Sequence, residues 1–382
     1  MRRSQILTSY FARSTAVKIG SGFVLGAALV GGVASAVVSP TPAVNACVDN
    51  KTQAMYLAPT GTCTKNRTLI DLGTGGMNVK AVAAAVTPSV VTVSVVDSSG
   101  AGTGSGSIIQ SNSSSSFILT NNHVVESAAS GGKITVEFSN GETSDATIVG
   151  RDSTYDLAVI KVPVGNLPVI AFGDSSALSI GDPVIAIGSP LGLSSTVTSG
   201  IVSALNRPVT TGSTSVTSFI DAIQTDAAIN PGNSGGALVD AQGRIVGVNS
   251  AIASLSSTST SQSGSIGLGF SIPINEAKRV ANELIANGKS TRPVLGVFFD
   301  NTYLGVGAKI SSLSPGEGAA VAGIPAGAII RTIDGFRIAD QVSAIVKIRS
   351  YAPLSIVSIM VDLPNGGGSK TFKVTLGSAP SQ

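Results

Sequence analysis

Short apolar runs dominate the chain between residues 90 and 272, either alternating with polar residues or continuously β-branched. Runs of this kind, separated by turn residues such as Asn140-Gly141, predict short strands. No long amphipathic helix interrupts them, so the pattern favours paired β-barrels over a doubly wound parallel sheet. The expected strands are Val90–Val96, Ser107–Ile109, Phe117–Thr120, Ile134–Phe138, Ala146–Val149, Leu157–Val162, Val184–Ile187, Val197–Leu205, Phe219–Gln224, Ala237–Val239, Ile245–Asn249 and Gly267–Ile272.

A second, smaller unit follows over residues 292–376, and its pattern mixes strands with two short helices. A helix over residues 275–287, with Asn275 as its cap and Gly288 just past its end, connects the two units. The predicted domains are therefore 78–273, a connecting segment 274–291, and 292–376, followed by a tail 377–382 without order. In the second unit we expect strands at Val294–Phe298, Val306–Ile310, Ala328–Ile333, Ser355–Val361 and Thr371–Leu376, and helices near Pro315–Ala322 and Ala339–Ile348.

The N-terminal region combines a basic segment, residues 1–18, with an apolar segment, residues 19–39. About 20 apolar residues can cross a bilayer as a helix, and the preceding basic residues predict a cytoplasmic N-terminus. This predicts a single-pass protein of the cell membrane with its catalytic domain outside the cytoplasm. The alternative is a cleaved signal peptide and a secreted protein, with the cut after Ala36 or Ala46. Residues 40–77 are predicted as an extracytoplasmic linker.

The amino-acid composition limits the partners and cofactors that the chain is expected to bind. The hydrophobic fraction of 43% allows a sizeable core, while 12% charged residues and a net charge of +3 do not favour a nucleic-acid partner. One histidine and two cysteines offer no ligand spacing for a metal, and no nucleotide motif is present, so no cofactor is predicted. Cys47 and Cys63 could close a disulfide in an oxidising compartment, or remain free thiols.

The single histidine, His123, is the centre of the predicted catalytic site. Downstream, Ser234 stands in the glycine-rich segment Gly232–Gly236. A neutral imidazole is the usual base that activates a serine hydroxyl, so a nucleophilic Ser234 has only His123 among histidines to serve it. Asp156 precedes the apolar run Leu157–Val162 and would orient the imidazole from the start of a strand.

Other assignments of this site fit the sequence less well. Asp152 and Asp145 are nearby alternatives for the orienting carboxylate, without a following apolar strand. The pattern Gly-x-Ser-x-Gly also occurs in α/β-hydrolases, but their histidine follows the serine, and here none does. Backbone N–H groups of the segment Gly232, Asn233 and Ser234 are predicted to form the oxyanion hole.

Several motifs together resemble the HtrA (DegP/DegS-like) family of serine proteases. They are Thr120–Val125, Asp156–Ile160, Ile223–Ile229, Asn230–Leu238 and Gly267–Pro273, and the resemblance extends over roughly residues 78–376. It implies a mostly β chain: a chymotrypsin-like double β-barrel followed by a small α+β PDZ domain. It also implies a serine endopeptidase for misfolded or signalling proteins outside the cytoplasm, which is independent of ATP, and a homotrimer is expected from the family.

The expected PDZ domain rests on three similar segments, namely Val294–Val297, Ser314–Ala320 and Ala326–Ile330. Such a domain adds a peptide strand to a sheet edge and binds the terminal carboxylate on backbone amides. Leu295, Gly296 and Val297 would line that site. The runner-up function from another class is a chaperone or PDZ adaptor whose protease fold is latent.

By the same resemblance, the residue six positions before the nucleophile lies at the base of the S1 pocket. That residue is Ala228, and with Ile229 it predicts a small apolar pocket and cleavage after Val, Ala or Ile. The loop around Val209–Ser218 resembles the family's sensor loop, and Ser254–Ser265 resembles one of its activation loops.

Overall fold

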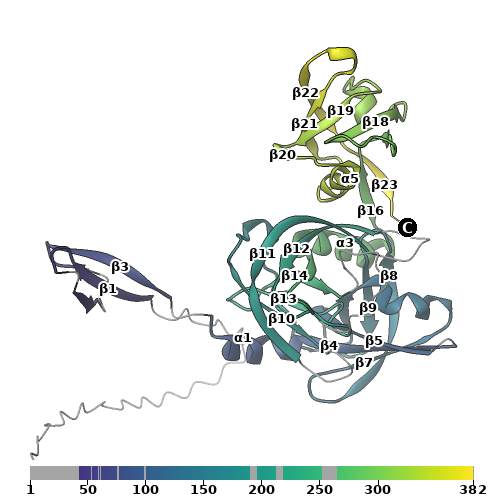
Figure 1. Cartoon of the computed structure of the whole chain (residues 1–382). Helices are drawn as coiled ribbons and strands as arrows, with labels where there is room; N and C mark the ends of the chain where they lie inside the picture. Colours follow the sequence, from purple (N-terminus) through teal and green to yellow (C-terminus); the bar gives the residue numbers. More distant parts are fainter. Residues whose placement is uncertain are drawn as a thin grey trace, which may run out of the picture. The chain divides into compact units, whose positions relative to one another are not determined.

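Two closed β-barrels are formed by the residues between 90 and 273 (Figure 1). A computed structural model describes residues 43–381 except 53, 59, 61, 75–76, 99, 190–195, 212–217 and 252–264. The mostly β architecture confirms the fold class predicted from the apolar pattern.

In the first barrel, the strands follow the order β4-β5-β6-β9-β8-β7, with all neighbours antiparallel. Val91, Val93 and Val95 of β4 point to the same face of the strand and pack in one buried cluster, while Val90, on the other face, is buried in a second cluster. The strands are β4 (Val90–Asp97), β5 (Gly100–Ser111), β6 (Ser116–Thr120), β7 (Lys133–Glu137), β8 (Thr143–Asp152) and β9 (Leu157–Val162).

The second barrel repeats this arrangement in the order β10-β11-β12-β15-β14-β13. Apolar side chains from both barrels and from α3 meet in one buried cluster, so the two barrels share part of their core. The strands are β10 (Pro183–Gly188), β11 (Thr196–Thr211), β12 (Ser218–Thr225), β13 (Ala237–Val239), β14 (Ile245–Ser250) and β15 (Gly269–Pro273).

Helix α3 (Ile274–Asn287) follows the second barrel as predicted, and its apolar face is buried. It ends at Gly288, whose φ of 71° is the left-handed conformation that glycine adopts without strain. The predicted cap is different: the helix begins after Pro273, and Asn275 instead donates a hydrogen bond to Asp174. Helix α1 (Val79–Val86), before the first barrel, was not predicted.

The C-terminal domain contains a sheet with the strand order β17-β18-β19-β21-β22, and β20 pairs with β19. Its own buried cluster, which includes Ile310, Ile330 and Ile359, is separate from the core of the barrels. The elements are β16 (Thr291–Val294), β17 (Val297–Phe299), β18 (Ala308–Leu313), α4 (Gly318–Val321), β19 (Ile329–Ile333), β20 (Phe336–Arg337), α5 (Gln341–Arg349), β21 (Ile356–Asp362) and β22 (Ser369–Thr375).

The tail beyond residue 376 differs from the prediction, because it forms a strand, β23 (Gly377–Pro380). It pairs antiparallel with β16, and Ser381 N–H donates to the carbonyl of Ser290. The tail is short and consists of small residues without alternating apolar positions. Its sequence therefore does not predict a strand, which becomes visible only through the pairing with β16.

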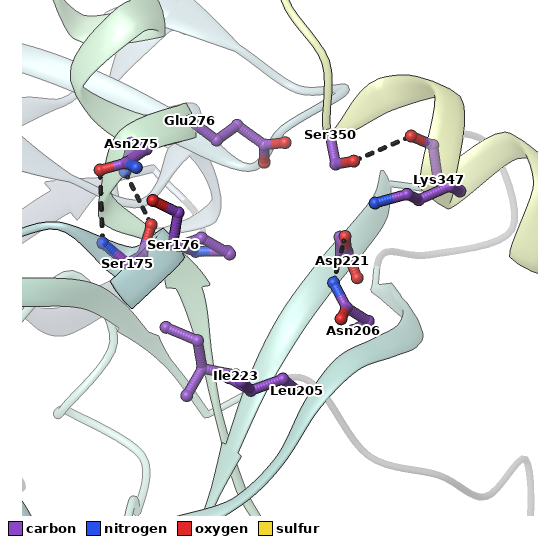
Figure 2. Close-up of a pocket in the computed structure, with 11 residues that line it drawn as sticks. Ser175, Ser176, Leu205, Asn206, Asp221, Ile223, Asn275, Glu276, Lys347 and Ser350 are labelled. Atoms are coloured by element: carbon purple, nitrogen blue, oxygen red, sulfur yellow. Dashed lines mark hydrogen bonds between the residues drawn. The ribbon is translucent and has the colours of Figure 1, made fainter. Parts of the chain in front are cut away.

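Helix α5 of the C-terminal domain contacts β11 and β12 of the second barrel. Beside this contact lies a cavity of about 330 Å³ lined from both sides. Figure 2 shows Lys347 and Ser350 on one side, Asp221 with Asn206 on the other, and the Glu276 carboxylate facing the space between them.

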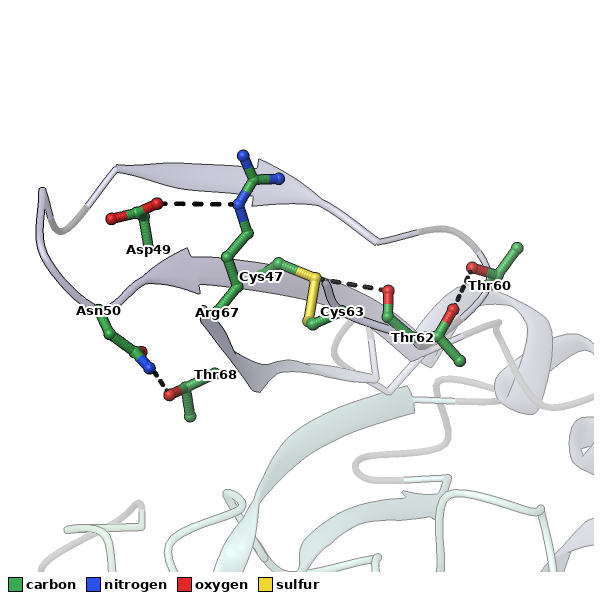
Figure 3. Close-up of a disulfide and its surroundings, with 8 residues drawn as sticks. All are labelled: Cys47, Asp49, Asn50, Thr60, Thr62, Cys63, Arg67 and Thr68. Atoms are coloured by element: carbon green, nitrogen blue, oxygen red, sulfur yellow. Dashed lines mark hydrogen bonds and ion pairs between the residues drawn. A yellow bond between two sulfur atoms is a disulfide. The ribbon is translucent and has the colours of Figure 1, made fainter. Parts of the chain in front are cut away.

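Residues 43–74 were predicted to belong to a linker, and the structure shows a three-stranded antiparallel sheet instead. The strands are β1 (Ala43–Asp49), β2 (Met55–Leu57) and β3 (Arg67–Thr74), in the order β2-β1-β3. Cys47 and Cys63 form a disulfide within it (Figure 3). A cross-link can stabilise a sheet whose apolar pattern is too weak to be read in the sequence.

The predicted single-pass membrane localisation is corrected by the structure. Within the part of the chain that the structure describes, no helix is long and apolar enough to cross a membrane. Helix α3 has 14 residues, fewer than the roughly 20 that a span needs, and only one of its faces is apolar. Residues 1–18 and 19–39, on which the prediction rested, lie outside the described residues.

Candidate active site

The side chains of His123 and Asp156 are hydrogen-bonded at one end of the first barrel. His123 lies in the short helix α2 (Asn122–Val125), which follows β6, and Asp156 directly precedes β9. The Nδ1 atom of His123 is 2.8 Å from Oδ2 of Asp156, and the Asp156 carboxylate also accepts a hydrogen bond from the His123 backbone N–H. These contacts fix the ring and leave its Nε2 directed away from the carboxylate.

The backbone of Asp156 is held in an uncommon conformation. Its φ is 53°, in the left-handed region that residues other than glycine seldom adopt. The side chain of Asn121 donates to the Asp156 carbonyl at 2.8 Å, and both residues are buried. The alternative Asp152 is also buried, but its carboxylate bonds to Ser290 and the Tyr155 N–H, away from His123. The exposed Asp145 pairs with Lys133.

Ser234 lies in the loop between β12 and β13 of the second barrel, and it is buried. Its carbonyl accepts from Ser105 N–H at 2.7 Å, which ties the loop to the first barrel. Its Oγ accepts a hydrogen bond from Ala251 N–H at 3.0 Å. Among the described residues, no hydrogen bond joins Ser234 to His123.

The three predicted oxyanion residues differ in their backbone bonding. Asn233 N–H donates to the Asn230 carbonyl within the turn, so it is already engaged. The N–H groups of Gly232 and Ser234 have no hydrogen-bond acceptor among the described residues. They are therefore the two donors left to stabilise a developing negative charge. Gly232 has a φ of 97°, which explains the need for glycine at this turn.

Ser105 supports this loop and was not predicted from the sequence. It is fully buried on β5, and its Oγ donates to the Gly232 carbonyl at 2.6 Å and accepts from Ser189 N–H at 2.8 Å. Close packing surrounds it, because a Cβ on Gly235 would lie 2.2 Å from the Ser105 carbonyl oxygen. A local sequence pattern could not have shown a contact that spans 127 positions.

The predicted S1 residues lie just upstream of the Ser234 loop. Ala228 is partly exposed, and its carbonyl accepts hydrogen bonds from Thr198 and Asn233. Ile229 is buried against Gly269, where an added Cβ would lie 2.9 Å from the isoleucine Cδ1. Neither residue brings a charge to this region.

Comparisons with known proteins agree with this geometry. Residues 104–248 match the family model of the trypsin-like peptidase domain. Serine protease PepD of Mycobacterium tuberculosis is 49% identical over 312 residues, covering 79% of this chain and 66% of that protein. Serine protease Do-like HtrA of Lactobacillus helveticus is 40% identical over 291 residues, covering 72% of this chain and 68% of that protein. The chain belongs to the HtrA family of serine proteases.

A solved HtrA structure supports the assignment. HtrA-type protease AlgW with a tripeptide is 32% identical, with a TM-score of 0.59, over 80% of this chain and 98% of that one. This confirms the predicted HtrA family and its class of serine endopeptidases. The chain spans 66% of the length of PepD, and between about one third and two thirds of the length of the other curated HtrA relatives that it matches.

The C-terminal domain of this HtrA-family chain carries a groove at the predicted peptide site. Leu295, Gly296 and Val297 line a cavity of about 410 Å³ together with Ile345 and Ile348 of α5. Gly296 has a φ of 77°, and a Cβ there would lie 2.1 Å from that of Glu317, so only glycine fits. The two regulatory loops expected by resemblance cannot be placed in the same way, since residues 212–217 and 252–264 lie outside the described residues.

Proposed function

We propose that the protein is an endopeptidase that cleaves misfolded or signalling proteins outside the cytoplasm through Ser234, His123 and Asp156. The observation that carries the proposal is the His123–Asp156 pair, whose Nδ1 is bound to the carboxylate, together with the packing of the Ser234 turn against the segment before His123: a Cβ on Gly235 would lie 3.1 Å from the backbone nitrogen of Asn121. Because Nδ1 is engaged, Nε2 is the atom that accepts the serine proton.

The reaction follows from these positions. His123 takes the proton of Ser234 as the hydroxyl attacks the peptide carbonyl, and the imidazolium is stabilised by Asp156. The N–H groups of Gly232 and Ser234 bind the oxyanion. His123 then returns the proton to the leaving amine. A water molecule, activated by His123 in the same way, hydrolyses the acyl-enzyme and frees Ser234.

The substrate pocket is proposed to accept small apolar side chains. Ala228 and Ile229 provide no carboxylate, so a Lys or Arg side chain of a substrate would have no counter-ion there. Cleavage after Val, Ala or Ile follows from this.

The C-terminal domain is proposed to be a PDZ domain that binds peptide C-termini in the groove beside Leu295, Gly296 and Val297. Two features support this: the groove has the strand β17 on one side and the helix α5 on the other, and the similar AlgW structure contains a tripeptide. A homotrimer stays a prediction.

Action outside the cytoplasm is supported by the Cys47–Cys63 disulfide, because such cross-links persist in oxidising compartments.

The experiment that tests the function is hydrolysis of unfolded casein by wild type, Ser234→Ala and His123→Ala proteins. We expect cleavage by the wild type, loss in both variants, and mass-spectrometric products that end in small apolar residues. Equal cleavage by Ser234→Ala, or products ending mainly in Lys or Arg, would contradict the respective part of the proposal.

One observation favours the alternative of a latent protease, namely the hydrogen bond between Ser234 Oγ and Ala251. A wild type that suppresses casein aggregation without cleaving it, even with a hydrophobic C-terminal peptide added, would support a chaperone instead.

A further inference from the structure

The cavity of Figure 2, with a volume of about 330 Å³, is separate from the protease site and from the peptide groove. None of the residues assigned to those two sites lines it. Nine of its eleven lining residues lie between residues 175 and 276, in or beside the second barrel, and the other two are Lys347 and Ser350. Sites for small molecules usually have volumes of about 300–1,000 Å³, so this cavity is large enough for a small ligand.

The carboxylate of Glu276 faces this cavity without a partner. The residue is 8% exposed, and its Oε1 atom has no hydrogen-bond partner among the described residues. Figure 2 shows the carboxylate directed into the space that the lining residues surround. Arg279 of the same helix does not supply the donor, because its Nη1 atom donates to Glu283 and to the Thr291 carbonyl. A ligand that brings a donor to Glu276 would satisfy a buried acceptor, which is otherwise unfavourable.

The charges of the lining favour a cation as that donor. Its acidic residues are Asp221 and Glu276, and its basic residue is Lys347. Burial raises the pKa of Asp221, while a hydrogen bond from Asn206 and the charge of Lys347 lower it, so Lys347 compensates Asp221. The described lining offers no second cation for Glu276. Leu205, Ile223 and Pro273 add an apolar portion that could cover a hydrocarbon chain.

We propose that this cavity binds a small primary amine, whose ammonium group donates to the Glu276 carboxylate and whose hydrocarbon part packs against Leu205 and Ile223. The site goes beyond the proposed peptidase function and does not depend on it. A metal ion matches the cavity less well, because the described residues include no group of three or more His, Cys, Asp or Glu side chains that could hold one.

The first arm of the test compares a cation with its neutral analogue. Hexylamine and hexanol are titrated at pH 8 into the full-length wild type, Glu276→Gln and Glu283→Gln proteins, and binding is followed by calorimetry and by ligand-observed NMR. Glu283→Gln is the matched control: Glu283 lies on the same helix and accepts from Arg279 and Thr291, which glutamine can still do. We expect the wild type to prefer hexylamine by roughly tenfold or more, the scale of one hydrogen bond to a charged group.

The preference should fall to about twofold in Glu276→Gln and persist in Glu283→Gln. A wild type that binds neither compound, or binds both equally, would overturn the amine site. A preference that survives in Glu276→Gln, or that is lost equally in Glu283→Gln, would overturn the assignment to Glu276. Thermal melting of each variant distinguishes a lost contact from a lost fold.

The second arm measures how the affinity for hexylamine depends on pH. Glu276 must lose its proton to pair with an ammonium group, and burial, followed by the charge of Asp221, raises its pKa to about 8. The affinity should therefore increase about tenfold or more between pH 6.5 and pH 8.5, a range in which an alkylamine stays protonated. The other titratable or charged groups around Glu276 are Asp221 of β12, Asp152 of β8, Tyr155 before β9, Arg279 of α3, and Lys347 and Arg349 of α5.

Glu276→Gln separates these groups from Glu276 itself. We expect its weak binding of hexylamine to stay constant within about twofold over the same pH range, since glutamine does not titrate. An equal increase in the variant would assign the pH dependence to the other groups and overturn the role of Glu276, and a wild type without any increase would do the same.

Discussion

At the scale of single residues, Asp156 combines an uncommon backbone conformation with the position that orients His123. Its φ of 53° is supported by Asn121, whose amide donates to the Asp156 carbonyl. Holding a non-glycine residue there is unfavourable by about 1–3 kcal/mol unless the surroundings impose it. Here the conformation places the carboxylate against the ring and the backbone N–H of His123.

The substitution Asp156→Asn should reduce kcat by about 10⁴-fold with little change in melting temperature. Asparagine tolerates the left-handed conformation, so the fold survives, while the imidazole loses the carboxylate that orients it and stabilises its charge. Reporter hydrolysis and thermal melting measure the two effects. Asp145→Asn, on the exposed surface, is the control, and an Asp156→Asn protein with nearly normal kcat would remove Asp156 from the triad.

Glu276 is a second residue whose surroundings set its chemistry. It is buried in α3, its Oε1 atom has no hydrogen-bond partner among the described residues, and it faces the cavity of Figure 2. Burial first, and then the charge of Asp221, raise its pKa to about 8. Asp152 acts in the same direction, while Arg279 and Arg349 act against it.

This pKa predicts that the wild type loses stability relative to Glu276→Gln as pH rises. The folded state binds the Glu276 proton more tightly than the unfolded state, so the stabilisation is complete below about pH 4.5 and is lost as pH rises through 8. Each unit by which the pKa differs between the folded and unfolded states corresponds to about 1.4 kcal/mol in the free energy of unfolding. Urea unfolding of both proteins at pH 5 and pH 8 measures the difference, which should increase by a few kcal/mol; a constant difference would mean that Glu276 titrates normally.

At the scale of secondary structure, the sequence predicted those elements whose own residues carry an apolar pattern. The valines of β4 and the buried face of α3 are examples, because period and burial coincide there. Strands β1 to β3 and β23 were missed, since a disulfide or a pairing with a distant strand stabilises them.

The residues of the candidate site also fall into two groups, those that the sequence predicts and those that only the structure shows. His123, Asp156 and Ser234 stand in recognisable local motifs, so the sequence was sufficient to propose them. Ser105 holds the loop through a hydrogen bond to Gly232, which is 127 positions away. No local pattern reports such contacts.

Strand β5 provides a test of how an element supports the site. Ser105→Ala removes the hydroxyl that bonds to the Gly232 carbonyl and the Ser189 N–H. This should lower the free energy of unfolding by about 1–3 kcal/mol. We expect kcat to fall about tenfold with KM nearly constant, because the loop that presents the oxyanion donors is less well held. Ser107→Ala is the matched control: Ser107 is buried on the same strand, and its hydroxyl has no hydrogen-bond partner among the described residues.

If Ser107→Ala slows the reaction as much as Ser105→Ala, the effect belongs to the barrel as a whole. If kcat falls only in Ser105→Ala, the effect comes from the loop that Ser105 holds.

At the scale of the whole molecule, the N-terminal sheet and the barrels have separate sources of stability. The sheet contains the Cys47–Cys63 disulfide, whose cysteines are 16 positions apart, whereas the barrels share an apolar cluster. A cross-link that closes a loop of this length contributes about 3 kcal/mol. Figure 3 shows that the other side chains drawn around it are mainly polar.

Replacing both cysteines by serine should therefore unfold the sheet and leave the protease intact. Limited proteolysis should cut the variant within residues 43–74 much faster than the wild type, while the melting temperature of the barrels changes little. Simultaneous loss of casein hydrolysis and of the main thermal transition would show that the sheet supports the barrels after all.

Strand β23 bears on how the C-terminal domain can be separated from the rest of the chain. Its pairing with β16 joins residues 377–380 to residues 291–294, and Ala379 itself lines the groove. A fragment cut at residues 292 and 376, as the apolar pattern alone would suggest, loses Ala379 from the lining of the groove and leaves β16 as an open sheet edge prone to aggregation. Peptide libraries screened against such a fragment would select ligands for a surface that the intact protein never presents.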